Sequence, residues 1–320
     1  MIFLQIKIIV GVFKLNNKEV TVIIPMYNGE KYISRCIESV LNQSYKKIEL
    51  IIVDDNSNDN SYKEIEKYIN NFSFVRYLKN DRCLGPAKSR NRGLEQTTSD
   101  YVLFLDCDDW IDLNCIEKAI NKFKSNPNID IVMWEIKTAY EYSKISSRYK
   151  YLYDNIITNT MALSLLSHSF ENEYFLSPLL GCKLFKKTLL DANKITFYDT
   201  IYEDDAFTFI SFFHSNKVAL ITGSCLYYYQ HSSSITHHFT EKYITDFFKT
   251  FSKLYNHLGN APKECFYKYL TKSLQSMINC MDNNVYDTKT LSKYKASIFT
   301  YFYNEINIEE YFSYSFSIVI

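Results

Sequence analysis

Short apolar runs alternate with amphipathic stretches over the first 135 residues of the chain. Five of these runs predict buried strands, at Val20–Pro25, Ile48–Val53, Val75–Leu78, Tyr101–Leu105 and Ile129–Trp134. Apolar residues at helical spacing predict helices between them, at Tyr32–Leu41, Tyr62–Ile69, Pro86–Gln96 and Leu113–Phe123. Strands that alternate with helices across short loops indicate βαβ units, so we expect an α/β fold with a Rossmann-like, mostly parallel sheet flanked by helices.

The pattern changes after about residue 135. Residues 140–175 are rich in tyrosine and irregular, with one predicted helix at Met161–His168. Further on, the spacing predicts helices at Leu184–Leu190 and from Glu203, and strands at Lys217–Thr222 and Leu226–Gln230. From Phe239 onward the pattern is helical and aromatic, so we expect an α-helical C-terminal region.

Composition narrows the class of protein. Lys plus Arg and Asp plus Glu are both 36, so the net charge is zero and nothing favours a nucleic-acid partner. The eight cysteines include no CxxC pair, which is typical of reduced thiols in a cytosolic protein. The apolar start, Met1–Phe13, is short and contains Lys7, which disfavours a signal peptide. No apolar run reaches the length of a membrane span, so we expect a soluble protein, with attachment to a membrane surface left open.

Acidic residues follow two of the predicted strands. Asp54 and Asp55 come after the second strand, and Asp106-Cys107-Asp108-Asp109 follows the fourth. In open parallel sheets, ligands bind beyond the carboxyl ends of the strands. Two carboxylates at i and i+2 suit Mg²⁺ or Mn²⁺, which often share oxygen ligands with substrate phosphates. The alternative for both clusters is a solvated turn or a helix cap.

Four other segments contain candidate side chains. After the first strand, Tyr27 could stack on a planar base and Asn28 suits a turn. Arg90 could pair with a phosphate oxygen or with the acids at 106–109. A carboxylate of Glu203-Asp204-Asp205 could act as a base, or its charge could simply stabilise a helix start. In Gln230–His238 a histidine could add a metal ligand, or have no chemical role.

Together these segments resemble the family-two glycosyltransferases, which have the A-type glycosyltransferase fold. The matching stretches are VTVIIPMYNGEKYISRCIESVLNQSY, IELIIVDDNSNDNS, GPAKSRNRGLEQTTSDYVLFLDCDDW, KLFKKTLL, YEDDAF and LYYYQHSSSIT, in the family's order over most of residues 20–236. The Gln-x-x-Arg-Trp motif of processive synthases is absent, since Gln230 is followed by His and Ser. This departure argues for a single transfer rather than processive polymerisation.

The resemblance implies roles for particular residues. The nucleotide-sugar donor would be bound by Pro25, Tyr27, Asn28, Asp55, Arg90, Asp106, Cys107 and Asp108. Asp106 and Asp108 would hold Mn²⁺ or Mg²⁺, with His237 as a further candidate ligand. Asp204, next to Glu203, would be the catalytic base, and Lys183 would lie on the acceptor side.

The implied activity is a metal-dependent, inverting transfer of a sugar from a nucleotide-sugar donor, a UDP-sugar by preference, to a glycan or lipid-linked glycan in cell-surface polysaccharide synthesis, such as capsule. We expect a cytoplasmic protein, with the inner face of the cell membrane as an open alternative, and no nucleic-acid partner. The predicted organisation is an N-terminal extension (1–19), a nucleotide-sugar-binding half (20–135), an acceptor-binding half with the base (136–240) and a helical C-terminal region (241–320).

Two other functions fit the same pattern. One is a non-catalytic protein that binds sugar nucleotides or glycans on the same fold. The other is a sugar nucleotidyltransferase, which would need a glycine-rich phosphate loop after the first strand. That loop, Pro25–Glu30, contains one glycine, which disfavours the second alternative.

Overall fold

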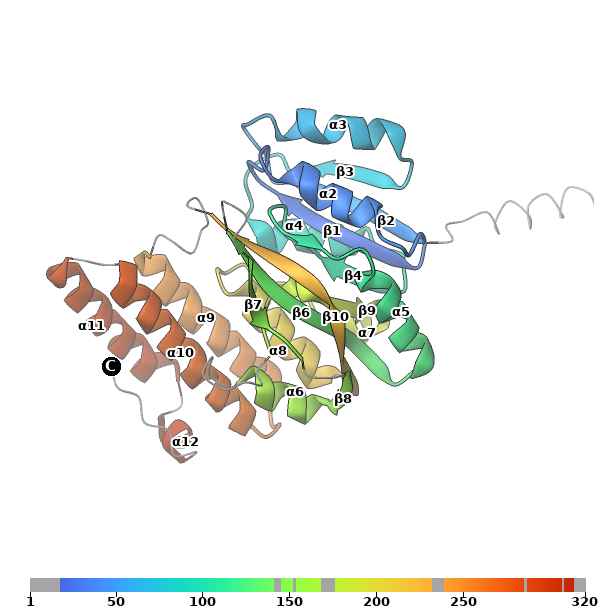
Figure 1. Ribbon diagram of the computed structural model, residues 1–320. Coiled ribbons are helices and arrows are strands. Elements are labelled where there is room, and N and C mark those ends of the chain that lie inside the picture. The colour runs from blue at the N-terminus through green and yellow to red at the C-terminus, as the bar shows by residue number, and fades with distance from the viewer. Residues whose placement is uncertain are drawn as a thin grey trace, which may run out of the picture.

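The computed structural model, drawn in Figure 1, describes residues 18–140, 145–151, 154–167, 176–231, 239–284, 287–306 and 308–313. Within these residues one ten-stranded sheet runs through the molecule in the order β3-β2-β1-β4-β9-β6-β10-β5, with β7 beside β6 and β8 beside β10. Helices flank this sheet, and further helices follow at the C-terminal end of the chain (Figure 1). The predicted α/β class is confirmed.

The first half of the sheet is parallel. Its strands are β1 (Val20–Met26), β2 (Ile48–Asp54), β3 (Val75–Lys79) and β4 (Tyr101–Phe104), joined through helices α2 (Ile33–Leu41), α3 (Ser61–Asn71) and α4 (Pro86–Glu95). Every residue of β1 and β2 is buried, as expected of parallel strands whose two faces are both covered. These strands therefore end side by side at one edge of the sheet.

The second half of the sheet is mixed. It comprises β5 (Trp110–Ile111), α5 (Cys115–Ser125), β6 (Ile129–Tyr140), β7 (Ile145–Tyr149), β8 (Asn155–Thr158), α6 (Asn159–Leu166), a short 3₁₀ helix (Leu180–Cys182), β9 (Lys183–Lys186), α7 (Lys187–Ala192), α8 (Glu203–His214) and β10 (Lys217–Gln230). Strand β10 runs parallel to β6, whereas β9 lies antiparallel between β4 and β6. Because β6 crosses position 135, both predicted halves share one sheet, and the domain boundaries stay a prediction.

Two predicted elements differ from the structure. The predicted helix at Leu184–Leu190 is wrong in its first part, because Lys183–Lys186 forms β9 and the helix begins only at Lys187. Pairing with strands on both sides overrides the helical spacing there. The two strands predicted within 217–230 are one strand, whose register shifts between Leu220 and Cys225. A β-bulge thus explains the apparent interruption.

The predicted helical C-terminal region is confirmed. It consists of α9 (Glu241–Leu258), α10 (Glu264–Asn284), α11 (Thr288–Glu305) and α12 (Ile308–Ser313). Helix α9 packs against α8 and α11, and α10 packs against α6 and α9, which buries the aromatic positions of this region. Every helix in the described part of the chain is too short or too polar to span a bilayer. The eight cysteines all lie within the described residues, and none of them is in a disulfide.

Candidate active site

The loops after β1 and β2 meet at the edge where these strands end. The backbone N–H of Asp55 donates to the carbonyl of Met26 at 2.8 Å, which joins the two strand ends. Asn28 has a φ of 50°, a left-handed conformation that asparagine tolerates. Its Oδ1 accepts from the N–H of Asn58 at 2.8 Å, so it ties the two loops together. The neighbouring Tyr27 is 48% exposed and offers an open aromatic face, whereas Pro25 is buried within β1.

Asp55 fixes the loop at residues 80–85. Its carboxylate accepts hydrogen bonds from the backbone N–H groups of Leu84 at 2.8 Å and Gly85 at 2.7 Å, and from the side chains of Asn80 at 2.7 Å and Cys83 at 3.2 Å. Burial, the largest single influence, raises the pKa of Asp55, but the hydrogen bonds from Asn80 and the two N–H groups together lower it. The buried carboxylate is therefore held ionised.

Arg90 of α4 connects the two halves of the sheet. Its guanidinium donates to Asp106 Oδ1 at 2.6 Å and to Glu203 Oε1 at 2.7 Å, and the side chain is 5% exposed. Burial lowers the pKa of Arg90, but the charges of Asp106 and Glu203 outweigh it and raise the pKa. Of the two pairings predicted for Arg90, the structure shows the one with the acidic turn. It also shows a second partner, Glu203, that the sequence did not indicate.

The Asp106–Asp109 turn carries carboxylates that face different ways. The side chain of Asp106 is 40% exposed beyond the end of β4, while Asp109 is buried and accepts from the N–H of Tyr229 at 2.8 Å. Asp108 Oδ2 lies 3.0 Å from Nε2 of His231. Burial and then the charge of Asp106 raise the pKa of Asp108. Three carboxylates thus lie on one turn, and one imidazole lies beside them just after the end of β10.

Cys107, between these acids, packs against the loop after β1. A Cβ atom on Gly29 would lie 3.2 Å from Cys107 Sγ, so the Cys107 side chain packs closely against the backbone at Gly29. Burial raises the pKa of the Cys107 thiol far above its usual range, which keeps it neutral. Its part in donor binding stays a prediction.

Arg35 and His231 support this turn. The guanidinium of Arg35 donates to the carbonyl of Asp108 at 2.8 Å and lies over the Trp110 ring at 3.7 Å. His231 stacks on Tyr32, with ring centroids 4.6 Å apart. Sequence reasoning missed Arg35, because a single arginine on an amphipathic helix carries no motif. His231 belongs to the predicted 230–238 segment.

The histidine named within that segment was His237, which lies outside the described residues. Its predicted role as a metal ligand therefore stays a prediction. Within the described part of the segment, His231 is the imidazole beside the acidic turn.

Asp204 lies in the first turn of α8, next to Glu203. Its Oδ1 accepts from the backbone N–H of Asp205 at 2.9 Å. Burial, followed by the charges of Asp205 and Glu203, raises the pKa of Asp204 well above its ordinary value, while Arg90 opposes this shift. A partly exposed carboxylate with raised proton affinity suits a general base.

Lys183 is fully buried at the start of β9. Its Nζ donates to the carbonyls of Ser177, at 2.7 Å, and Leu179. The amine therefore holds the 177–182 segment in place and does not face solvent. That this segment lines the acceptor side stays a prediction.

The donor set fits a hard divalent cation whose shell is completed by a substrate. Among the described residues, no three His, Cys, Asp or Glu side chains gather into a complete metal cage. Mg²⁺ is commonly bound by one or two carboxylates together with substrate phosphates. Asp106 and Asp108, with His231 beside them, are such a partial set.

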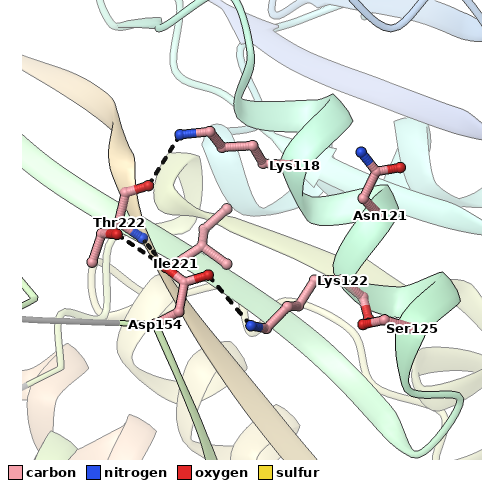
Figure 2. Close-up of a pocket in the computed structure, with 7 residues that line it drawn as sticks. All are labelled: Lys118, Asn121, Lys122, Ser125, Asp154, Ile221 and Thr222. Atoms are coloured by element: carbon pink, nitrogen blue, oxygen red, sulfur yellow. Dashed lines mark hydrogen bonds and ion pairs between the residues drawn. The ribbon is translucent and has the colours of Figure 1, made fainter.

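A shallow depression of about 450 Å³ lies elsewhere, between α5 and the bulge of β10 (Figure 2). Two lysines on its wall are already engaged: Lys118 donates to the carbonyls of Thr222 and Gly223, and Lys122 pairs with Asp154. None of the predicted site residues lines it, since its walls are formed by Lys118, Asn121, Lys122, Ser125, Asp154, Ile221 and Thr222. It is separate from the candidate active site.

Two solved glycosyltransferases have the same architecture. The crystal structure of Staphylococcus aureus TarS 1-349 in complex with UDP-GlcNAc superposes with a TM-score of 0.74 at 19% identity, covering 92% of this chain and 83% of that one. The mannosyltransferase PcManGT from Pyrobaculum calidifontis, in complex with GDP-Man and Mn²⁺, gives a TM-score of 0.58 at 15% identity and covers 95% of this chain and 77% of that one. The fold is therefore the A-type glycosyltransferase fold.

Sequence comparison gives the family. The model of the family described as "Glycosyl transferase family 2" matches residues 21–180, half of the chain. The poly(ribitol-phosphate) beta-N-acetylglucosaminyltransferase TarP of Staphylococcus aureus is 31% identical over 253 residues, which cover 77% of this chain and 73% of TarP. An uncharacterized glycosyltransferase of Haemophilus influenzae is 41% identical over 112 residues, covering 35% of this chain and 45% of that protein. The chain belongs to glycosyltransferase family 2. It spans less than half the length of several curated relatives, such as 35% of TarS.

Proposed function

We propose that this glycosyltransferase is a metal-dependent, inverting enzyme that moves a sugar from a UDP-sugar to a hydroxyl group of a cell-surface glycan or its lipid-linked precursor. The observation that carries the proposal is the Arg90 bridge, which fixes the DxD turn at Asp106 to Glu203, the neighbour of the candidate base. Support for the donor and acceptor classes comes from TarS, whose structure holds UDP-GlcNAc, and from the poly(ribitol-phosphate) transferases among the relatives.

Donor binding is proposed at the ends of β1, β2 and β4. The exposed ring of Tyr27 would stack on the planar base of the nucleotide. Asp55 and Asn28 keep the surrounding loops in place. Asp106 and Asp108 would hold Mn²⁺ or Mg²⁺, and we propose His231 as the imidazole of this site because it already touches Asp108. When bound, the metal ion neutralises charge on the departing diphosphate.

The proposed chemical step is a single displacement. Asp204 accepts the proton of the acceptor hydroxyl as its oxygen bonds to the anomeric carbon, while the bond from that carbon to the diphosphate oxygen breaks. Attack opposite the leaving group inverts the anomeric centre. Glu203 is paired with Arg90 and buried, so its carboxylate is engaged and Asp204 is the available base. Lys183 supports the 177–182 segment, which we assign to the acceptor side.

We propose a cytoplasmic enzyme, because free cysteines are typical of a reducing compartment. A lipid-linked acceptor would bring it to the inner face of the cell membrane.

Release of nucleoside diphosphate tests the proposal. Wild type, Asp108→Ala and Asp204→Asn are incubated with UDP-, GDP- and dTDP-sugars, with Mn²⁺, Mg²⁺ or EDTA, while donor binding is followed by thermal shift. We expect metal-dependent turnover of a UDP-sugar that EDTA and Asp108→Ala both abolish. Asp204→Asn should keep metal-dependent donor binding and lose turnover. Near-wild-type transfer by Asp204→Asn would refute the base assignment, and absence of metal-dependent donor stabilisation in wild type would favour the non-catalytic alternative.

A further inference from the structure

The C-terminal helices hold the start of the helix that carries Asp204. Asp246 of α9 accepts from the backbone N–H of Ile201 at 3.0 Å, and Thr250 of α9 donates to Thr200 Oγ1 at 2.8 Å. Both contacts fix the turn that leads into α8, and Figure 1 shows α8 between the sheet and α9. The conformation of the first turn of α8 therefore depends on the C-terminal region.

A more direct contact comes from α10. The hydroxyl of Tyr269 donates to Asp205 Oδ1. Tyr269 is 1% exposed, and its ring stacks on Phe209 of α8 with centroids 5.4 Å apart. Because the ring is packed on the same helix that it contacts through its hydroxyl, Tyr269 holds the Asp205 side chain in one orientation.

Asp205 in turn contacts the candidate base. Its backbone N–H donates to Asp204 Oδ1 at 2.9 Å. The contacts thus form a chain from α10 through Asp205 to Asp204. None of the three residues that make these contacts, Tyr269, Asp205 and Asp204, belongs to the predicted metal-binding turn.

The same contacts also affect the pKa values of Asp204 and Asp205. Burial raises the pKa of Asp205 above its ordinary value. The hydrogen bond from the Tyr269 hydroxyl opposes this rise most strongly, followed by the charge of Lys272. Lys183 also faces Asp204 and Asp205, and burial lowers the pKa of Lys272 to about 8 although Asp205 opposes this shift. An ionised Asp205 repels charge on Asp204 and so raises its proton affinity, as Glu203 does, while Arg90 acts against both.

We propose that Tyr269 is a positioning residue for Asp204, acting through Asp205, so that the C-terminal helical region completes the active site. The proposal rests on the proposed function of Asp204 as the base. It gives the C-terminal region a role in catalysis beyond packing against α6 and α8.

The test compares Tyr269→Phe with a matched control, Tyr267→Phe. Tyr267 lies on the same helix, and its hydroxyl donates to Glu310 of α12 at 3.0 Å. For Tyr269→Phe we expect kcat to fall about tenfold with the donor KM unchanged, because the base is displaced or less well oriented. We also expect the acid limb of the kcat–pH profile to move to lower pH by about one unit, since Asp205 then binds its proton more readily and stops raising the pKa of Asp204. Asp205→Asn should move the limb in the same direction.

Either of two results would overturn the proposal: unchanged kcat in Tyr269→Phe, or a loss of kcat equal to that of Tyr267→Phe with no movement of the limb. If wild type releases no diphosphate, the proposed function fails. The contact between Tyr269 and Asp205 is then tested separately by ¹³C NMR of the aspartate carboxyl groups. Tyr269→Phe should raise the titration midpoint of the Asp205 resonance, which is assigned by its loss in Asp205→Asn. An unchanged midpoint would refute the role of Tyr269.

Discussion

The Arg90 bridge makes a prediction about stability that needs no substrate. The guanidinium and the Glu203 carboxylate are 5% and 9% exposed, and Glu203 loses its main charged partner if Arg90 is removed. Arg90→Met would leave Glu203 as an uncompensated buried charge, which costs about 3–5 kcal/mol. Asp106 adds little to this figure, because its carboxylate is 40% exposed and remains solvated.

Urea unfolding at neutral pH measures the effect, with Arg76→Met as the control. Arg76 also pairs with a carboxylate, Glu49, at 3.1 Å, but is 38% exposed, so its loss should cost about 1 kcal/mol or less. Burial raises the pKa of Glu203, and Arg90 opposes this rise. In Arg90→Met the pKa of Glu203 is therefore higher still, and the destabilisation should shrink as pH falls and Glu203 becomes neutral.

The double variant Arg90→Met/Glu203→Gln should recover most of the lost stability, since it removes the unpaired charge. The reasoning is refuted if Arg90→Met costs no more than Arg76→Met, or if adding Glu203→Gln restores nothing.

Three further changes test other contacts by the same unfolding measurement. Gly93→Ala should destabilise the protein by about 1–3 kcal/mol, because the new Cβ would lie 2.5 Å from Ile23 Cγ2. This is the opposite of the usual gain when alanine replaces glycine in a helix. Adding Ile23→Ala should relieve the penalty. Asp55→Asn should cost about 1–3 kcal/mol at pH 7, and the difference from wild type should vanish as pH falls through the lowered pKa of Asp55, where the wild-type carboxylate also becomes neutral. His214 and His257, whose Nε2 atoms lie 2.8 Å apart, both have lowered pKa values, so wild-type stability should fall as pH drops below about 6.5, and His257→Gln should flatten that dependence.

The parallel half of the sheet could be predicted because each of its strands is recognisable from the residues of that strand and its immediate neighbours in the sequence. The runs at Val20 and Ile48 are mostly apolar and fully buried, and the acids Asp54 and Asp55 mark the end of the second run. Those features depend on neighbours in the sequence. The strand at Lys183–Lys186 does not: its residues pair with β4 and β6, which lie far away in the chain, and its local spacing favours a helix.

The same distinction applies to the site. Asp55 and the Asp106–Asp108 pair could be recognised as candidate site residues from their residue type and their position directly after a predicted strand. The contacts of Arg90 with Glu203, across 113 residues, and of His231 with Asp108, across 123, depend on tertiary packing that no local pattern encodes. Sequence reasoning therefore found the carboxylates and the pairing of Arg90 with the acidic turn, but not the contact of Arg90 with Glu203 or that of His231 with Asp108.

These long-range contacts imply that the site forms only when the whole sheet is complete. Strand β4, which ends at the acidic turn, is covered on one side by β9, and β9 is bound on its other side by β6. Without residues 183–186, β4 would present an unpaired edge next to the donor site. Arg90 would at the same time lose Glu203, its buried partner from α8. The parts of the chain proposed to bind the donor and to carry the base therefore share one sheet, and the Arg90 bridge is a contact through which the geometry of one constrains the other.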